Sequence, residues 1–160
     1  MKKVLFICTG NSCRSIMAEY ILSKLGSGKF ESYSCGSSPI GVVNPITLQT
    51  IERHGANPED FSSKSWNDFK NKGIDISITV CGAAQSETCP IFLDSTIKAH
   101  WDTFDPTGFV AESKEELAAE FDRVYKIMEQ RIQSMIELPM DEMSDDEIAR
   151  HLNEIGEKIS

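Results

Sequence analysis

The opening residues of this chain place a short apolar strand directly before a loop and a helix. Residues 3–7 read Lys-Val-Leu-Phe-Ile, a run typical of a buried parallel strand, and residues 9–11 (Thr-Gly-Asn) follow as a loop. A helical pattern begins at Ser15, and Gly26 is its expected end. Strand, loop and helix in this order form the first half of a β-α-β unit, which predicts a parallel sheet.

Strands and helices alternate along the rest of the chain, which predicts an α/β fold with helices on both faces of the parallel sheet. Ligands of such sheets bind beyond the carboxyl ends of the strands, so residues at those ends are the candidates for function. The expected elements are strands over 30–35, 74–80 and 97–101, and helices from 45 to Gly55, from the capping box Ser113/Glu116, and from the capping box Ser144/Glu147 to a stop before Gly156.

The net charge of -9 argues against nucleic acid and anionic membranes as partners, because an acidic protein repels both. The apolar run at the N-terminus is too short for a signal peptide or a membrane span, so we expect a cytoplasmic protein. Cysteines in that compartment stay reduced, and an odd number of them points to catalysis or redox work. The five cysteines are Cys8, Cys13, Cys35, Cys81 and Cys89, and Cys35 is expected to be a buried apolar residue.

The loop between Cys8 and Arg14 has the composition of an oxyanion site. Its backbone N–H groups can turn inward, Gly10 permits a tight turn, and the dipole of the following helix favours an anion. Arg14 can bind two oxygens of a tetrahedral oxyanion and lower the pKa of Cys8, and Ser15 can donate to the resulting thiolate. The bare Cys-x5-Arg spacing is weakly specific, and an ordinary strand-to-helix turn with a buried cysteine is the alternative.

The stretch from Val4 to Ser15 resembles the phosphate-binding loop of the low-molecular-weight protein tyrosine phosphatase superfamily, which also includes arsenate reductases. The resemblance implies a three-layer fold with a four-stranded parallel sheet, and Cys8 as the nucleophile. It extends to about Ile136, and the tail resembles the extended C-terminus of some members. We therefore expect a single domain over 1–160 with a helical extension at about 140–160. The residues expected to bind the oxyanion are Thr9, Gly10, Asn11, Ser12, Cys13 and Arg14.

The pair Asp105-Pro106 matches the position at which the superfamily carries its general acid. An oxygen leaving phosphorus or arsenic must be protonated, and a carboxyl group on a loop over the anion can supply the proton. Taken alone, Asp-Pro is a common turn signal. Tyrosine phosphatases of this fold usually carry a tyrosine after the pair, and Thr107 stands there instead, so an aromatic wall for phosphotyrosine is unsupported.

Cys81 and Cys89 favour reduction over hydrolysis. Cys81 ends a predicted strand at the active-site edge, and a short segment of small and polar residues separates it from Cys89, which suits a disulfide relay. The sequences at 63–66 and 98–101 also resemble the arsenate reductase branch. The resemblance implies that Cys8 attacks arsenate, Cys81 then attacks Cys8, and Cys89 attacks Cys81. An external thiol reductant, thioredoxin or glutaredoxin/glutathione, would complete the cycle, with no tightly bound cofactor.

Alternatives remain at this stage. A low-molecular-weight phosphatase acting on phosphotyrosine or small aryl phosphates is the second hypothesis, and a non-catalytic oxyanion sensor is the third. With a glutaredoxin or a small thiol as reductant, Cys89 need not take part. Cys13 is expected to be structural or a protective partner of Cys8. Asn11, Glu19 and Ser34 match positions that bind potassium in some related reductases, but the matching carboxylate near 63–65 is absent, so we expect no metal site.

Overall fold

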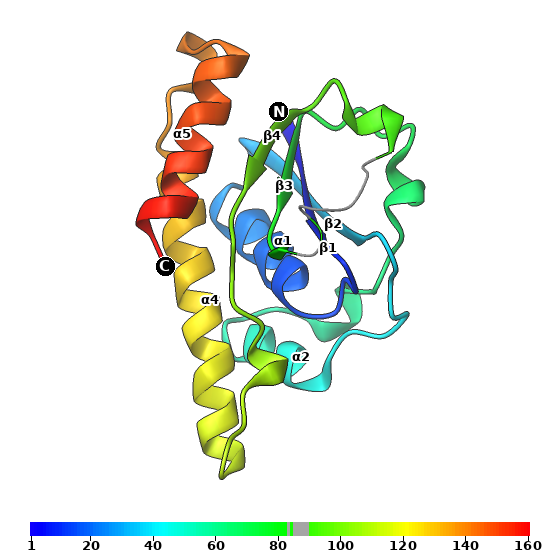
Figure 1. The fold of residues 1–160 in the computed structure, drawn as a ribbon, viewed down its shortest axis with the longest axis vertical. Helices are drawn as coiled ribbons and strands as arrows, with labels where there is room; N and C mark the ends of the chain where they lie inside the picture. The colour runs from blue at the N-terminus through cyan, green and yellow to red at the C-terminus, as the bar shows by residue number, and fades with distance from the viewer. Residues whose placement is uncertain (83, 85–89) are drawn as a thin grey trace.

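The computed structural model describes residues 1–82, 84 and 90–160, and four parallel strands in this part form one sheet. The strand order is β2-β1-β3-β4, with β1 in the interior of the sheet (Figure 1). The strands span Lys2–Cys8 (β1), Phe30–Gly36 (β2), Ile76–Thr79 (β3) and Ile97–His100 (β4). β1 is buried from Val4 to Cys8, which explains its unbroken apolar run. The predicted α/β class and four-stranded parallel sheet are confirmed.

The register of the sheet brings the carboxyl ends of the strands together. Ile7 lies opposite Thr79 of β3, and Cys8 lies opposite Gly36 of β2. The next residues of each chain segment, including Cys81 after β3, therefore leave the sheet at one edge. This common edge is where a site can form.

Helix α1 (Arg14–Leu25) packs on β1 and β2 and against the long helix α4 (Lys114–Ile136). Helix α2 (Pro45–Arg53) also contacts α4. Ser34 of β2 bonds to Glu19 of α1, so Tyr33 points to the opposite face, where its ring lies 5.6 Å from that of Phe69. Phe69 belongs to a short 3-10 helix, η2 (Trp66–Phe69), so both faces of the sheet are covered.

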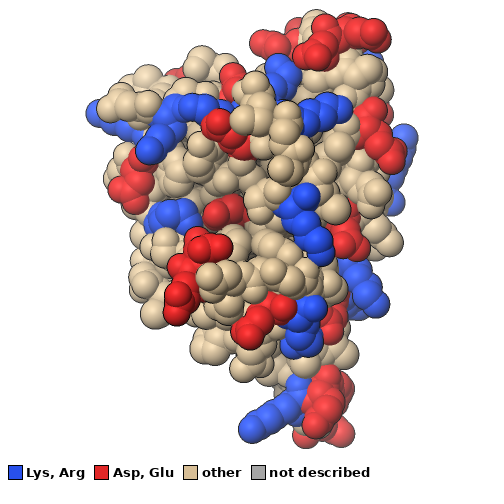
Figure 2. Space-filling model, turned by 180° about the vertical axis from the view of Figure 1, so that it is seen from behind, with Lys and Arg blue, Asp and Glu red and all other residues tan. Residues whose placement is uncertain are grey.

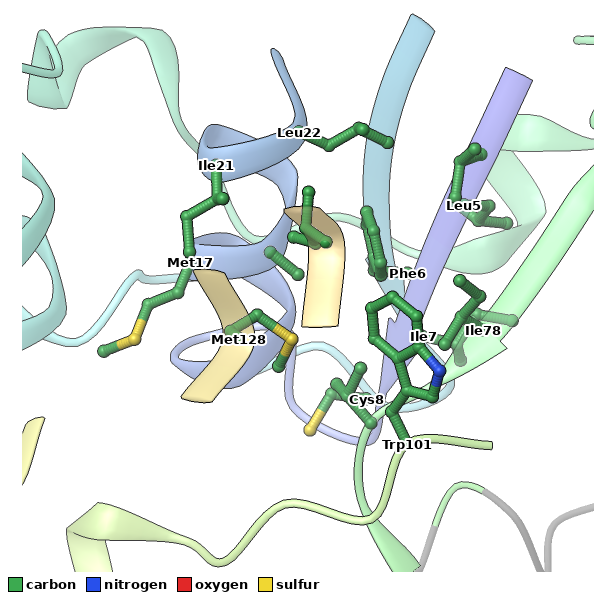
Figure 3. Packing of buried hydrophobic residues seen from close by; sticks show 14 of the residues in the cluster. Leu5, Phe6, Ile7, Cys8, Met17, Ile21, Leu22, Ile78, Trp101 and Met128 are labelled. Atoms are coloured by element: carbon green, nitrogen blue, oxygen red, sulfur yellow. The ribbon is translucent and has the colours of Figure 1, made fainter. Parts of the chain in front are cut away.

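Helix α5 (Asp145–Lys158) lies beside β4 and α4 (Figure 1). Trp101, which follows β4, is fully buried, and its ring lies 6.1 Å from that of Phe6 (Figure 3). Its Nε1 donates to the carbonyl of Leu152 at 2.8 Å. His100 N donates to Asn153 Oδ1 at 2.9 Å. The C-terminal helix is therefore fixed to the segment that leaves β4.

Acidic and basic side chains are interspersed over the face shown in Figure 2, without a large basic patch. None of the helices among the described residues is long and apolar enough to cross a membrane. Among the described residues, further 3-10 turns join the elements: η1 (Pro58–Asp60), η3 (Ile91–Leu93), η4 (Pro106–Gly108) and η5 (Met140–Glu142).

The expected helix stop before Gly156 is wrong, because α5 continues through this residue to Lys158. A Cβ atom at position 156 would lie 2.7 Å from Trp101 Cδ1 and 2.8 Å from the carbonyl oxygen of His100. Glycine is therefore present here because the helix approaches the backbone after β4 closely. The predicted third strand is also shorter than expected, since β3 covers only Ile76–Thr79 of the apolar run.

Gly156→Ala should lower the free energy of unfolding by about 1–3 kcal/mol, because the new methyl group would meet the backbone carbonyl oxygen of His100, which cannot move aside cheaply. Urea denaturation followed by circular dichroism measures the change. Gly108→Ala is the matched control, since nothing lies within 4 Å of its Cβ position. Equal stabilities of the two variants would contradict the close approach.

Candidate active site

The loop after β1 turns its carbonyl groups outward. The segment that follows β2 donates to these carbonyls along its length, so the N–H groups of the same peptides point the other way, into the loop. The bonds run from Ser38 N to Thr9 O (3.0 Å), from Ile40 N to Gly10 O (3.0 Å) and from Asn44 N to Ser12 O (2.9 Å). The inward amides stand at the N-terminus of α1, where the helix dipole adds a positive potential. This is the arrangement that the composition of the loop predicts.

Asn11 braces the loop from within. It has a φ of 48°, in the left-handed region that asparagine tolerates better than most residues. Its Nδ2 donates to Ser15 Oγ at 2.8 Å and to Ser34 Oγ at 3.0 Å, and its Oδ1 accepts from Lys64 N at 2.7 Å. Because Ser15 Oγ accepts from Asn11, its own proton is available to another group. A hydrogen bond from Ser15 to Cys8 stays a prediction.

A partly buried ion pair supports this brace. Glu19 accepts a hydrogen bond from Ser34, and Lys64 Nζ lies 3.4 Å from Glu19 Oε1. Burial raises the pKa of Glu19, and Lys64 acts in the opposite direction. Sequence reasoning missed Lys64, although the absence of a carboxylate near 63–65 was the available signal. Instead of a carboxylate, this segment brings a positive charge to Glu19.

Arg14 and Asp105 lie together, as their expected roles require. Arg14 Nη1 donates to the carbonyl of Thr103 at 2.9 Å, and Nη2 lies 3.7 Å from Asp105 Oδ2. The Nε of Arg14 is buried and has no hydrogen-bond partner within residues 1–82, 84 and 90–160. An unpaired buried donor beside the loop fits a site for an anion oxygen. Asp105 Oδ1 accepts from Thr107 N (3.0 Å) and Thr107 Oγ1 (2.6 Å), so Thr107 orients the carboxylate.

The thiols of Cys8 and Cys81 share a hydrogen bond, although the two residues are far apart in sequence. That bond lowers the pKa of Cys81 to about 5, and further bonds from Ala84 N (3.4 Å) and Thr9 Oγ1 (3.7 Å) act in the same direction. The same bond, together with burial, raises the pKa of Cys8, and Arg14 opposes this. The contact therefore favours a negative charge on the Cys81 sulfur over one on the Cys8 sulfur.

From the sequence we expect Arg14 to lower the pKa of Cys8 far enough to give a thiolate. The guanidinium of Arg14 does lower the pKa of Cys8, but the contact with Cys81 and the burial of the side chain outweigh it. Cys8 is 5% exposed and Cys81 is 2% exposed, so both sulfurs lie within the protein. Cys81 therefore raises the pKa of Cys8 by more than Arg14 lowers it.

The other cysteines take no part in the hydrogen bonds that Cys81 makes with Ala84 and Thr9, and one of them lies outside the described residues. Cys13 is the residue before α1, and burial raises its pKa to about 11, with Thr47 and Arg14 opposing. Cys35 is fully buried on β2. Cys89 lies outside the described residues. In the part of the chain that the structure describes, no cluster of three His, Cys, Asp or Glu side chains is placed to hold a metal.

The sequence matches the family described as low molecular weight phosphotyrosine protein phosphatase over residues 3–149. Three relatives of similar sequence are named as arsenate reductases. Arsenate reductase 1 of Staphylococcus epidermidis is 36% identical over 67% of this chain and 80% of the relative, and the arsenate reductase of Halalkalibacterium halodurans is 32% identical over 85% and 96%. The glutaredoxin arsenate reductase of Synechocystis is 34% identical over 68% and 81%.

Solved structures agree with the sequence relatives. An arsenate reductase in the phosphate binding state superimposes with a TM-score of 0.65 at 31% identity, over 83% of this chain and 98% of the other. A thioredoxin-dependent arsenate reductase of Corynebacterium glutamicum gives a TM-score of 0.58 at 26% identity, over 83% and 62%. The chain belongs to the arsenate reductases of the low molecular weight phosphotyrosine protein phosphatase family. The predicted family and fold class are confirmed.

The reaction of this arsenate reductase with iodoacetamide should depend on pH, because the thiolate of the Cys8–Cys81 pair reacts and the neutral thiols do not. Since the pKa of Cys81 is lowered to about 5, one thiolate is present above that pH and is lost as the pH falls through it. We expect labelling at pH 6 on Cys8 or Cys81, located by peptide mapping, and none on Cys13. A labelling rate that rises only above about pH 8, as for an ordinary thiol, would contradict a thiolate with this lowered pKa.

Proposed function

We propose that this enzyme reduces arsenate to arsenite through nucleophilic attack by Cys8 and a thiol–disulfide relay through Cys81 and Cys89. The observation that carries the proposal is the position of Cys81 beside Cys8, where β1 and β3 end at one edge of the sheet and each thiol shifts the pKa of the other. A phosphatase needs water at the sulfur-bound intermediate, whereas a reductase needs a second thiol that can reach the first. In this chain a second thiol already lies beside the first.

The first step forms a bond between Cys8 sulfur and arsenic. Cys8 passes its proton to Cys81 and attacks arsenate, which the inward amides of the loop and the buried Nε of Arg14 would hold. One arsenate oxygen leaves as water with a proton from Asp105, which lies beside Arg14. The product is an arseno-cysteine ester in which arsenic keeps its oxidation state of five.

The second step transfers two electrons to arsenic. Cys81 attacks the sulfur of Cys8 and gives its proton to an arsenic-bound oxygen, so a disulfide forms while the sulfur–arsenic bond breaks. The electron pair of that bond stays on arsenic, which leaves as arsenite. Cys89 then attacks Cys81, which frees Cys8 and leaves a Cys81–Cys89 disulfide. An external dithiol reduces this disulfide and returns the enzyme to its starting state.

The reductant belongs to the thioredoxin or glutaredoxin class in this proposal. Named relatives of both kinds occur among the arsenate reductases that this chain resembles. Reduced cysteines are the rule in a cytoplasmic protein, which suits an enzyme that must begin each cycle with free thiols. We propose arsenic resistance as the biological role.

Cys81→Ser should abolish arsenite release, because a hydroxyl group cannot form a disulfide with Cys8. The first step, formation of the arseno-cysteine ester, should remain possible. Mass spectrometry after one turnover with arsenate should find Cys8–Cys81 or Cys81–Cys89 disulfides in the unmodified enzyme and neither in the variant. Cys35→Ala, which removes a buried thiol on β2, is the control and should keep the relay.

The outcomes also separate the two candidate activities. Arsenate-dependent turnover that survives Cys81→Ser intact would show that the relay is wrong. Strong hydrolysis of an aryl phosphate, unaffected by the substitution, would instead favour a phosphatase.

Asp105→Asn should slow arsenite release in a single turnover roughly 100- to 10,000-fold, because the amide cannot protonate the leaving oxygen. Alkylation of the thiol pair, which needs no acid, should change little. The control is Asp102→Asn, since that carboxyl group lies on the same segment with its side chain 78% exposed. Equal rates for both variants would remove Asp105 from the mechanism.

A further inference from the structure

Arg131 of α4 is a buried cation for which the proposed mechanism has no use. Its side chain is 1% exposed, and burial lowers its pKa, with Asp102 acting in the opposite direction. No ion pair joins it to a carboxylate in the described part of the chain. An apolar side chain would fill such a place at lower cost in desolvation. The groups that Arg131 binds must therefore explain why a cation is buried at this position.

The guanidinium of Arg131 joins two segments to α4. On one side Nη1 donates to Thr103 Oγ1 at 2.9 Å and Nη2 to the carbonyl of Asp102 at 2.8 Å. On the other side Nε donates to the carbonyl of Ile159 at 2.7 Å and Nη2 to that of Gly156 at 3.3 Å. A planar group with five donors can satisfy all four acceptors at once, which an ammonium group cannot.

Thr103 links Arg131 to the active site. This residue is 4% exposed, and its hydroxyl also donates to the carbonyl of Trp101 at 2.9 Å. Its own carbonyl accepts from Arg14 Nη1 at 2.9 Å. One residue therefore receives Arg131 through its side chain and Arg14 through its backbone, two positions before the carboxyl group of Asp105.

We propose that Arg131 is a positioning residue that holds the segment from Asp102 to Asp105 in the place from which Asp105 protonates the leaving oxygen. The inference rests on the proposed function, because it assigns Arg131 to the acid of that reaction. It also gives the C-terminal helix a role in the site. Arg131, Trp101 and His100 contact Leu152, Asn153 and Gly156 of α5 and Ile159 directly after it, all beyond the residue at which the family match ends.

The residues at 140–160 are, in this proposal, part of the single catalytic domain and not an appended tail. Gly156 supports this reading, since its lack of a side chain is what allows α5 to approach Trp101 and present a carbonyl to Arg131. The helix then forms the fixed wall against which the segment after β4 is held.

A double-mutant cycle tests the proposal. Arg131→Lys keeps the charge but cannot bind four acceptors in the same way, so single-turnover arsenite release should slow by up to roughly 100-fold. In the Asp105→Asn background the same substitution should change the rate within about 2-fold, since the acid that it positions is already lost. The alkylation rate of the thiol pair should stay within the same margin in every variant. Arg150→Lys, on the exposed side of α5, is the matched control.

Equal slowing by Arg131→Lys in both backgrounds, or a matching fall in the alkylation rate, would overturn the proposal in favour of a general structural role. Thr103→Val provides a second variant if Arg131→Lys does not fold. It removes the hydroxyl that Arg131 binds and keeps the carbonyl that Arg14 binds, and it should show the same dependence on Asp105. Thr103→Val with the rate of the unmodified enzyme would also overturn the proposal.

A failure of the proposed function gives different results from a failure of the inference about Arg131. An unmodified enzyme that releases no arsenite, or an Asp105→Asn variant that is as fast as the unmodified enzyme, contradicts the proposed function and with it this inference. An enzyme that meets both requirements, but in which Arg131→Lys behaves as Arg150→Lys does, contradicts the inference alone.

Discussion

The contact between the thiols of Cys8 and Cys81 is the interaction on which the rest of the site depends. A buried thiolate is costly unless donors surround it, and here the second thiol, the amide of Ala84 and the hydroxyl of Thr9 supply them. These groups meet only because β1 and β3 are parallel neighbours whose carboxyl ends leave the sheet at one edge. The sheet therefore does more than support the loop, because it decides which thiol lies next to the nucleophile.

The anion site solves a problem that the composition of the chain creates. With a net charge of -9, this protein cannot attract arsenate by a general positive field. It relies on fixed local dipoles, and their direction is set by bonds outside the loop that take up the carbonyls of Thr9, Gly10 and Ser12. Asn11 holds the turn from the inside, and the pair of Glu19 and Lys64 holds Asn11 in turn. The donors are thus in place before an anion arrives.

Sequence reasoning succeeds here where the signal is local. The strand, loop and helix around Cys8 follow from hydrophobic pattern, turn residues and helix start within a few positions, and Asp105 is recognisable by the proline after it. Lys64 and Arg131 leave no such pattern, because their partners lie 45 and 28 positions away. Gly156 misleads for the same reason, since a close approach to a distant backbone gives a helix the residue that normally ends one.

The difference between a phosphatase and a reductase on this fold lies in what reaches the nucleophilic sulfur second. The loop and Arg14 treat phosphate and arsenate alike, as tetrahedral anions that accept the same hydrogen bonds. Arsenic in the arseno-cysteine ester can accept two electrons when its bond to sulfur breaks. Phosphorus in the corresponding phospho-cysteine does not accept them, and an oxygen nucleophile displaces the sulfur from it instead. A thiol held against Cys8 with a lowered pKa is suited to the first outcome and of no use to the second. The position of Cys81 after β3 therefore carries more information about the reaction than the loop by which the family is recognised.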